Sequence, residues 1–357
     1  MLYNFCTLFD KNYFYKGLAL YNSLKRNCDD FKLFILCMDD ITYNLLKRMA
    51  LEKIQLITLK EFEDEDLLEA KKNRTWAEYC WTCTASLILF LFKKYPELEI
   101  MTYLDADLYF FNDPKPFFDE FNNSSIFITK NNLAPEYKRL SVYGKYSVQF
   151  NIFRNNEDSL KALNWWRKKT INWCRSRSRN LFHFMQKKKQ NMQGGDQIYL
   201  ENWPLKFKNV QVLKNEKLCL APFNISQYPI FLKNNTIHIE DSVLIFYHFH
   251  SFEINEKNNF TLADGAYKIT KKVRELIYFP YINEIKNIMK EVKEIEPDFN
   301  YGIIKKSFKQ KTLYLMKKTL YSFYRLRLKL EKNKIYERSN FSRGFWDKDA
   351  SRNQSHK

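Results

Sequence analysis

Strand-like apolar runs and amphipathic helix-like runs alternate over the first hundred residues, and this alternation most constrains the fold of the 357-residue chain. Parallel strands need crossover helices, so the pattern predicts a mostly parallel sheet covered by helices. After residue 110 the pattern becomes mixed. We therefore expect an α/β fold with a mixed central sheet flanked by helices. The expected strands are 2–9, 31–38, 54–59, 100–104, 125–129, 147–153 and 243–247, and the expected helices are 16–25, 43–50, 77–94 and 158–174.

Length and composition narrow the class of protein. The chain is long enough for one large domain or two modest ones, and its 45% hydrophobic residues are ample for a core. With only 7 glycines it has no Gly-x-Gly-x-x-Gly and no Walker loop, which argues against dinucleotide dehydrogenases and P-loop enzymes. No apolar run is long enough for a membrane span, and the N-terminus enters a strand-like run without a basic signal region. We expect a cytoplasmic site of action.

The seven cysteines, an odd number scattered along the chain, predict reduced and mostly buried thiols. Cys80 and Cys83 form a Cys-x-x-Cys, which could serve as a redox pair or as half of a zinc site. No second Cys-x-x-Cys or histidine pair follows at zinc-finger spacing, and the pair lies inside an aromatic, helix-like run. We therefore expect both cysteines to pack in the core.

Two carboxylates stand one residue apart where an apolar strand ends, in the sequence YLDADLYF of residues 103–110. In an extended chain residues i and i+2 point to the same side, so Asp105 and Asp107 can reach one site at the carboxyl end of the strand, where open α/β sheets bind ligands. Two hard oxygen ligands suit Mg²⁺ or Mn²⁺, which waters and substrate phosphates usually complete. The simpler interpretation is a pair of turn or surface acids.

The net charge of +18 is concentrated at the C-terminal end. Residues 301–357 hold 16 Lys or Arg and 4 Asp or Glu, a net charge of +12 that leaves +6 for the first 300 residues. Apolar residues of this tail fall at multiples of four with basic residues between them, which is typical of a basic amphipathic helix on an anionic membrane surface. The apolar positions are Ile304, Phe308, Met316, Leu320, Tyr324 and Leu328.

Other interpretations of the tail remain open. The apolar stripe can pack on the protein's own catalytic domain, and the alternation over 325–330 also permits a strand. A basic tail can attract nucleic acid, but no zinc finger, RNP-like or Gly-rich RNA motif accompanies it. We therefore expect no nucleic-acid partner.

Five blocks stand in order along the chain: FCTLFD at 5–10, EYCWTCT at 78–84, YLDADLYF at 103–110, GDQ at 195–197 and YHFH at 247–250. Together they resemble the GT-A glycosyltransferases over roughly residues 1–250, and they look closest to bacterial nucleotide-diphospho-sugar transferases related to family-eight enzymes. The resemblance implies a GT-A (Rossmann-like) fold, a nucleoside-diphosphate sugar donor with UDP-sugar favoured, Mn²⁺ or Mg²⁺, and a glycan or lipid-linked hydroxyl acceptor in cell-surface glycan synthesis, such as lipopolysaccharide or capsule.

The resemblance also implies a metal centre. Asp107 would be the principal metal ligand, and Asp105 would touch both the metal and the donor ribose. A late histidine often completes the metal in related enzymes, and here it is His248 or His250, which share one face of a strand end and are not separated by spacing. Either histidine can instead be a satisfied core residue.

Asp196 and Gln197 match the acidic–glutamine pair that borders the acceptor side in such folds. Asp196 could be a general base on the acceptor hydroxyl if the reaction inverts the anomeric centre, or could orient sugar hydroxyls if it retains. It could also be only the N-cap of the helix that follows. The two glycines before it allow the backbone to approach the substrate closely.

Thr7 and Asp10, at the end of the first strand, fall where the family holds the nucleobase and ribose, and Asp39 at the end of the second strand can do the same or form a turn. The chain departs from the family-eight pattern in two places. No arginine is evident in the helix before the metal motif, and no His-x-x-Gly-x-x-Lys-Pro-Trp appears near the late histidines. Arg74 is a candidate substitute for the missing contact to the donor phosphates.

The expected organisation is a catalytic domain over 1–265, divided into a nucleotide-sugar half (1–112) and an acceptor half (113–265), then a helical extension over 266–300 and a basic amphipathic tail over 301–357. Such a tail would place the protein peripherally on the cytoplasmic face of the inner membrane. Two rival classes remain. Aspartyl-phosphate phosphatases also use Asp-x-Asp after a strand, but they usually have Thr or Val where this chain has Tyr109. An inactive transferase fold could serve as an adaptor that binds glycan or membrane.

Overall fold

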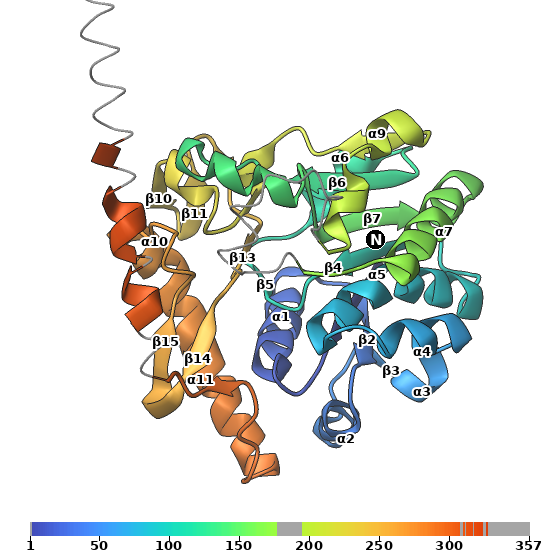
Figure 1. Ribbon diagram of the computed structural model, residues 1–357, viewed down its shortest axis with the longest axis horizontal. Coiled ribbons are helices and arrows are strands. Elements are labelled where there is room, and N and C mark those ends of the chain that lie inside the picture. Colours follow the sequence, from blue (N-terminus) through green and yellow to red (C-terminus); the bar gives the residue numbers. More distant parts are fainter. Residues whose placement is uncertain are drawn as a thin grey trace, which may run out of the picture. The chain divides into compact units, whose positions relative to one another are not determined.

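The computed structural model describes residues 2–176, 195–307, 310, 312–316, 318–323 and 326–327. The chain forms two compact units: the first comprises Met1–Ala263 and Ile269–Lys305, and the second comprises Asp264–Lys268 and Lys306–Lys357. The first unit is a layered α/β structure in which a central sheet carries helices on its faces (Figure 1). Among the described residues, no helix is both long and apolar enough to cross a membrane.

A seven-stranded sheet forms the centre of the first unit. The first four strands in space are mutually parallel, β7 is antiparallel to both of its neighbours, and β8 is parallel to β6. The predicted α/β fold with a mixed central sheet is therefore confirmed. In spatial order the strands are β3 (Ile54–Thr58), β2 (Phe31–Cys37), β1 (Tyr3–Phe9), β4 (Ile100–Leu104), β7 (Tyr146–Arg154), β6 (Ile126–Lys130) and β8 (Val210–Val212).

Helices connect these strands and cover the sheet, as crossovers between parallel strands require. The long helix before β4 starts at a capping box in which Thr75 and Glu78 satisfy each other's backbone N–H groups. The helices of the first unit are α1 (Phe14–Asn27), α2 (Asp40–Met49), α3 (Leu59–Phe62), α4 (Glu65–Lys71), α5 (Trp76–Lys94), α6 (Lys115–Phe121), α7 (Glu157–Asn172), α9 (Trp203–Lys206), α10 (Lys271–Val273) and α11 (Phe279–Ile295).

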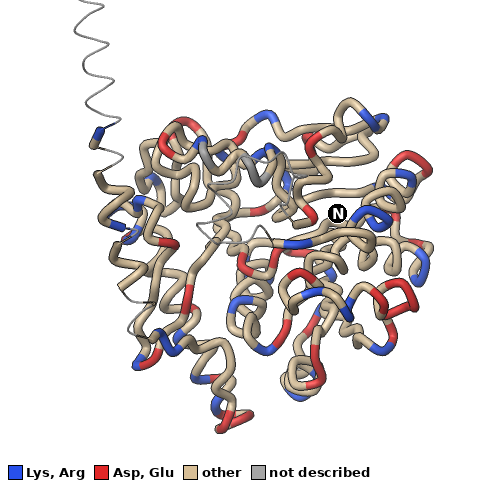
Figure 2. The backbone as a smooth tube through the Cα atoms, viewed as in Figure 1, with Lys and Arg blue, Asp and Glu red and all other residues tan. Residues whose placement is uncertain are grey.

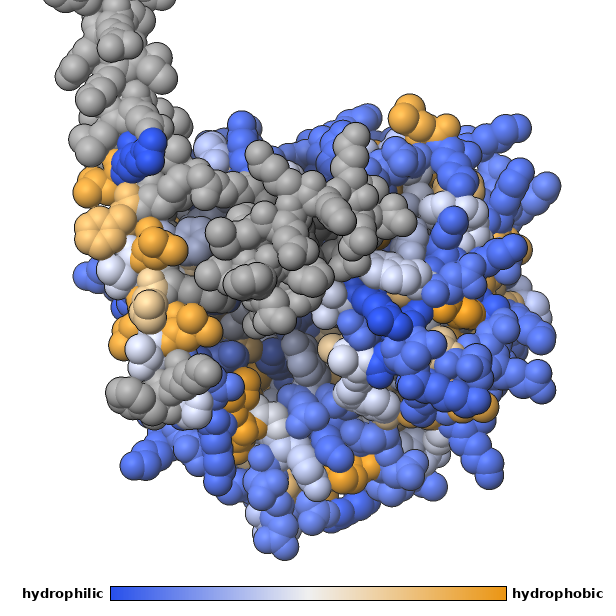
Figure 3. All heavy atoms as spheres, viewed as in Figure 1, coloured by the Kyte–Doolittle hydropathy of each residue, from blue (hydrophilic) through white to orange (hydrophobic). Residues whose placement is uncertain are grey.

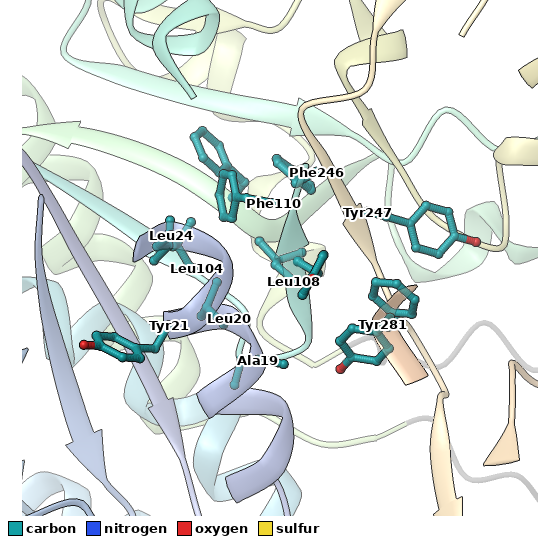
Figure 4. Packing of buried hydrophobic residues seen from close by; sticks show 14 of the residues in the cluster. Ala19, Leu20, Tyr21, Leu24, Leu104, Leu108, Phe110, Phe246, Tyr247 and Tyr281 are labelled. Carbon is teal, nitrogen blue, oxygen red and sulfur yellow. The ribbon is translucent and has the colours of Figure 1, made fainter. Parts of the chain in front are cut away.

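The core lies on both faces of the sheet, because the side chains of a strand alternate between faces. In β1, Phe5 and Phe9 pack in the cluster that contains residues of α1, α6 and α11, whereas Cys6 and Leu8 pack in the cluster that contains residues of α5 and α7. Figure 4 shows part of the first cluster, where side chains of α1 meet Leu104 of β4. Because both faces of β1 are buried, its sequence is an almost continuous apolar run.

A second, three-stranded sheet brings the late histidines beside the Asp-x-Asp motif. Its strands are β5 (Leu108–Phe110), β13 (Phe246–His248) and β9 (Cys219–Leu220), and β13 runs antiparallel to β5 with His248 opposite Leu108. The strand expected over 243–247 is wrong in its bounds, because β12 (Ser242–Val243) pairs with β11 in another sheet and β13 starts only at Phe246. The remaining strands are β10 (Ile230–Lys233), β11 (Thr236–Ile239), β14 (Glu253–Asn255), β15 (Asn259–Thr261) and β16 (Ile303–Ile304).

All seven cysteines are free, and six of them are buried while Cys80 is half-buried. Cys80 and Cys83 both lie on α5, and burial raises the pKa of both thiols. The prediction of free and mostly buried thiols is confirmed. A raised pKa leaves little thiolate at neutral pH, which is the opposite of what a redox or metal-binding pair requires.

The second unit contains a helical stretch within residues 310–327. Its described apolar side chains are exposed, and Figure 3 shows several of them as orange spheres. Ile304 does not belong to this stripe, because it lies in β16 of the first unit, which pairs with β14. Phe308, Tyr324 and Leu328 of the predicted stripe lie outside the described residues. The exposed apolar residues of the stretch are Leu313, Leu315, Met316, Leu320, Phe323 and Leu326.

Candidate active site

The Asp-x-Asp motif forms the turn between β4 and β5. The backbone N–H of Asp105 donates to the Gln149 carbonyl of β7 (2.9 Å), and the Asp107 carbonyl accepts from the Phe249 N–H (2.9 Å). The two carboxylates therefore reach one site across a backbone turn held by two neighbouring segments, and not along one extended strand as the spacing suggested. The turn follows the carboxyl end of β4, next to β1, where the strand order of the sheet reverses.

Asp105, Asp107 and His248 come together as a group, with one ligand atom of each lying within 4.8 Å of the others. Nε2 of His248 is 3.0 Å from Oδ1 of Asp107 and 3.9 Å from Oδ2 of Asp105. The pairing of β13 with β5 produces this approach, because it sets His248 opposite Leu108, the residue after the motif. His250 is exposed and lies outside this group, although its charge still lowers the pKa of Asp107.

Gln149 orients the histidine, and the sequence interpretation missed it. Its side-chain oxygen lies 2.6 Å from Nδ1 of His248, so Nδ1 donates the hydrogen bond and Nε2 is directed at the two carboxylates. Metal-binding histidines are usually held in this way by a hydrogen bond at the other ring nitrogen. One signal was available in the sequence, since the polar residues Ser147, Gln149 and Asn151 alternate with apolar residues in β7, and all three are buried.

Electrostatics couple the three groups. Burial opposes the ionisation of Asp107, but the charge and hydrogen bond of His248 outweigh burial and hold the pKa of Asp107 below its usual range. Burial likewise opposes the protonation of His248, but the charge and hydrogen bond of Asp107 together with the charge of Asp105 outweigh burial and raise the pKa of His248. Burial raises the pKa of Asp105 to about 6. A divalent cation at this site would displace protons, so its binding should strengthen as pH rises.

The donor set fits the expected ion. Two carboxylates offer hard oxygen atoms, and the imidazole offers Nε2 because Gln149 engages Nδ1. Carboxylate oxygens suit Mg²⁺ and Mn²⁺, and an imidazole is compatible with a transition-metal ion such as Mn²⁺. A metal ion held by three protein ligands also keeps coordination positions open for a substrate. The group is therefore able to hold Mn²⁺ or Mg²⁺.

Asp196 lies close enough to Asp105 to feel its charge. Burial, followed by the charge of Asp105, raises the pKa of Asp196 to about 7, while a hydrogen bond with Thr84 acts in the opposite direction. The indole N–H of Trp166 donates to the Asp196 carbonyl at 3.0 Å and fixes the backbone. Within the described residues, the Asp196 side chain makes no capping hydrogen bond to the helical turn Gln197–Leu200. A carboxyl with a pKa near neutrality is suited to accept or hold a proton.

Gly195, which precedes Asp196, needs to be glycine for two reasons. Its φ of +65° is in the left-handed region, and an added Cβ would lie 3.2 Å from the ring of Trp81 on α5. The close approach predicted for this position is thus made to Trp81. Gln197 is half-buried and follows directly in the chain, and its side chain lies against the position of Gly144.

The residues expected to hold the nucleoside lie at the carboxyl ends of β1 and β2, where they also support the local backbone. Asp10 accepts hydrogen bonds from the backbone N–H groups of Asn12 and Tyr13 and from the indole N–H of Trp76. Asp39 caps α2 through Thr42 and also accepts from the Lys11 N–H. Thr7 is fully buried, and its hydroxyl has no hydrogen-bond partner among the described residues.

Arg74 contacts another part of the fold. Its guanidinium donates to the carbonyl oxygens of Thr170 and Ile171 in the last turn of α7, at 3.4 and 3.0 Å. These bonds satisfy carbonyls that a helix end leaves without intrahelical partners. Burial lowers the pKa of Arg74. Its proposed contact to the donor phosphates stays a prediction.

Fold and site together define an α/β protein with a buried carboxylate–histidine centre at the carboxyl edge of its sheet. The chain belongs to the family of YfnD, an uncharacterized protein of Bacillus subtilis strain 168, with which it shares 32% identity over 308 residues, 85% of this chain and 95% of YfnD. YfnF of the same organism, also uncharacterized, is 27% identical over 308 residues, which cover 83% of this chain and 96% of YfnF. No family model matches the chain.

Solved structures similar to this one include glycosyltransferases. The galactosyltransferase LgtC shares 13% identity, with 80% of this chain and 95% of LgtC covered and a TM-score of 0.48. Mouse xyloside xylosyltransferase 1 shares 12% identity, with 70% of this chain and 97% of the mouse chain covered and a TM-score of 0.45. GlyE of Streptococcus pneumoniae TIGR4 shares 14% identity, with 84% of this chain and 65% of GlyE covered and a TM-score of 0.41. The family-eight grouping stays a prediction.

Replacing Gln149 with Leu should weaken Mn²⁺ binding by about tenfold to a hundredfold, because His248 loses the bond that fixes its ring and tautomer. Titration calorimetry with Mn²⁺ measures the effect. The matched control is Gln211→Leu on β8, a half-buried glutamine that donates to Glu120 instead. Equal Mn²⁺ affinity in the two variants would show that Gln149 does not position the histidine.

Proposed function

We propose that the chain is a metal-dependent glycosyltransferase. It would move a sugar from a nucleoside-diphosphate sugar, with a UDP-sugar favoured, to a hydroxyl group of a glycan or lipid-linked acceptor in cell-surface glycan synthesis, as in lipopolysaccharide or capsule. The observation that carries the proposal is the buried group of Asp105, Asp107 and His248 with Asp196 beside it. A cation site next to a carboxyl of near-neutral pKa provides for a diphosphate donor and for a hydroxyl acceptor in one place.

The side chains divide the chemistry between them. Asp105, Asp107 and His248 would hold Mn²⁺ or Mg²⁺, and such an ion neutralises charge on a diphosphate leaving group when bound. Gln149 keeps the His248 ring in position, and the backbone bonds of the motif turn keep the carboxylates in position. Asp196 would accept the proton of the acceptor hydroxyl or orient the sugar hydroxyls.

A thermal-shift screen tests the proposal. UDP-, GDP-, CMP- and dTDP-sugars are each added with and without Mn²⁺, and the unfolding temperature is measured. A ligand at 100 times its Kd stabilises the folded state by about 2.7 kcal/mol, so a specific donor should give a clear shift that requires Mn²⁺. No shift with any nucleotide sugar, in protein that is folded, would favour the alternative function, an inactive transferase-fold adaptor that binds glycan or membrane.

The proposal includes action in the cytoplasm at an anionic membrane surface. The seven free cysteines suit a reducing compartment. The helical stretch of the second unit exposes apolar side chains, and residues 301–357 carry a net charge of +12 from 16 basic and 4 acidic residues. In the first unit, by contrast, acidic and basic residues are interspersed along the backbone (Figure 2). The tail is therefore the part suited to such a surface.

Replacing Met316, Leu320 and Phe323 together with Ser should reduce binding to vesicles containing anionic lipid by about a hundredfold or more. Each apolar side chain buried in the lipid interface contributes about 1.5 kcal/mol or more. These three side chains are exposed, so folding should be unaffected. The matched control replaces three exposed leucines of the first unit, Leu68, Leu205 and Leu232, with Ser. Vesicle co-sedimentation measures both variants, and equal binding would contradict a membrane role for the tail.

A further inference from the structure

Lys16 is a buried lysine whose ammonium group makes no close ion pair among the described residues. It stands in the first turn of α1 and is only 7% exposed, and among the described residues no other lysine or arginine is buried to this degree. Nζ lies 4.0 Å from the centre of the Tyr13 ring. Within the part of the chain that the structure describes, the ammonium makes no hydrogen bond or ion pair. A charge in this setting is unusual unless something else is bound there.

Its position in the helix adds to the cost of this charge. The first turn of a helix carries partial positive charge from its free N–H groups, which favours an acid and disfavours a lysine. The first turn of α1 contains no acidic residue. Burial lowers the pKa of Lys16, and the charges of Asp107 and Glu253 act in the opposite direction. Asp10 accepts from the Asn12 and Tyr13 N–H groups just before α1, whereas the Lys16 ammonium makes no such bond to an acid, so an anion would stabilise it.

A second polar group without a partner lies in the same region. Tyr281 of α11 is fully buried, and its hydroxyl has no hydrogen-bond partner among the described residues. Burial, and then the charges of Asp107 and Tyr13, raise the pKa of Tyr281. Figure 4 shows Tyr281 in the buried cluster that also contains Ala19 and Leu20 of α1 and Leu108 of β5. A native protein rarely leaves a buried hydroxyl without a partner, so this group also indicates a missing ligand.

The Tyr281 ring stacks on Phe249 with ring centres 3.6 Å apart, and the Phe249 N–H donates to the carbonyl of Asp107, which belongs to the candidate metal group. The charge of Asp107 also acts on Lys16. The chain lacks the Lys-Pro-Trp motif expected near its late histidines, and Arg74 is bonded to the end of α7. A diphosphate held by the Asp105–Asp107–His248 group would therefore need another cationic group. Lys16 is a long side chain with three donors, which suits phosphate oxygens.

We propose that Lys16, with the hydroxyl of Tyr281 as a second donor, binds the diphosphate of the donor and of the nucleoside diphosphate product. The inference rests on the proposed function and adds the residues that hold the phosphates. The diphosphate would supply the close ion pair that the Lys16 ammonium does not make among the described residues. Lys16 is thus buried for binding, at a cost to the stability of the ligand-free protein.

The test uses Lys16→Met and Tyr281→Phe in the full chain, with Lys25→Met as the matched control. Lys25 lies on the same helix, but it is exposed and pairs with Glu52. Calorimetry measures the affinity for Mg²⁺ alone and then for inorganic pyrophosphate in the presence of Mg²⁺. Lys16→Met should weaken pyrophosphate binding by about tenfold to a hundredfold and Tyr281→Phe by several-fold, since bonds to charged groups are the strong ones. Affinity for Mg²⁺ alone should be unchanged or higher, because a positive charge near Asp107 is removed.

Thermal unfolding without ligand supplies an independent readout. Methionine matches the length of lysine without its charge, so Lys16→Met should unfold at the same or a higher temperature. Lys16→Gln serves as a second variant. Wild-type pyrophosphate affinity in folded Lys16→Met and Lys16→Gln would overturn the inference, as would a fall in unfolding temperature with unchanged affinity. If the wild type itself bound neither Mg²⁺ nor pyrophosphate, the proposed function would fail instead.

Discussion

Asp107→Asn should abolish Mn²⁺-dependent binding of the nucleotide sugar and lower the rate of transfer by on the order of a thousandfold. Asp107 is 6% exposed and its Oδ1 is 3.0 Å from His248 Nε2, so it is a buried member of the candidate metal group. A bound cation contributes several kcal/mol to the stabilisation of developing charge, and 1.36 kcal/mol corresponds to a factor of ten in rate. The carbonyl of residue 107 still accepts from the Phe249 N–H, which keeps the turn in place.

Two measurements separate this effect from a loss of folding. Calorimetry measures the affinity of the site for Mn²⁺, and thermal unfolding measures the stability of the fold. The control is Asp119→Asn, which replaces an exposed acid that pairs with Lys115 on α6. This variant should leave the Mn²⁺ affinity and the unfolding temperature unchanged. Normal turnover by Asp107→Asn would remove the metal assignment altogether.

Asp196→Asn should lower the rate of transfer by about a hundredfold to ten-thousandfold while leaving Mn²⁺ affinity near that of the wild type. Asn keeps the size of the side chain but cannot accept a proton. Because the pKa of Asp196 is raised to about 7, the wild-type rate should increase as pH rises through 7, when Asp196 becomes a carboxylate. This pH dependence should be missing in Asp196→Asn.

The pH profile of kcat/KM decides between the roles of Asp196. If Asp196→Asn loses both the rate and the increase of kcat/KM with pH, Asp196 is a general base. A reduced rate with this increase retained indicates that Asp196 only orients the sugar. Asp66→Asn, which removes an exposed partner of Arg167, controls for the loss of one charge. A wild-type rate in Asp196→Asn would leave the residue a structural role only.

Local patterns were sufficient for six of the seven strands of the central sheet, all except β8, and for two of the three candidate metal ligands. Strands β1, β2 and β4 are short apolar runs buried on both faces, so composition and length alone indicate them. Asp105 and Asp107 follow a strand end, which suggested one shared site, although a turn and not an extended chain provides it. These features depend only on residues close in sequence.

Long-range pairing decides the rest of the site. His248 and His250 are equivalent by alternation, and only the register of β13 against β5 and the contact to Gln149 distinguish them. Gln149 itself reaches the histidine from β7, across 99 positions of the sequence. Lys16 resembles an ordinary surface lysine of an amphipathic helix until its burial is known. No local rule contains this information, because it arises from packing between distant segments.

The period-of-four interpretation of the tail failed at its first member for a similar reason. Ile304 fits the helical spacing, but two residues of backbone pairing with β14 hold it in a strand. The spacing of apolar residues does not show that a distant strand such as β14 will pair with a short segment of the tail. The described helical stretch begins only at residue 310.

Strand β16, although only two residues long, fixes which backbone lies at one edge of a small sheet. β14 pairs with β15 on one side and with β16 on the other, so Ile303 and Ile304 cover its second edge. A protease cut before Ile303 would bare that edge and offer a template for pairing with other chains, whereas a cut after Lys305 would leave it covered. The position of a nick in this short segment would therefore determine whether β14 keeps its covalent link to the strand that covers it.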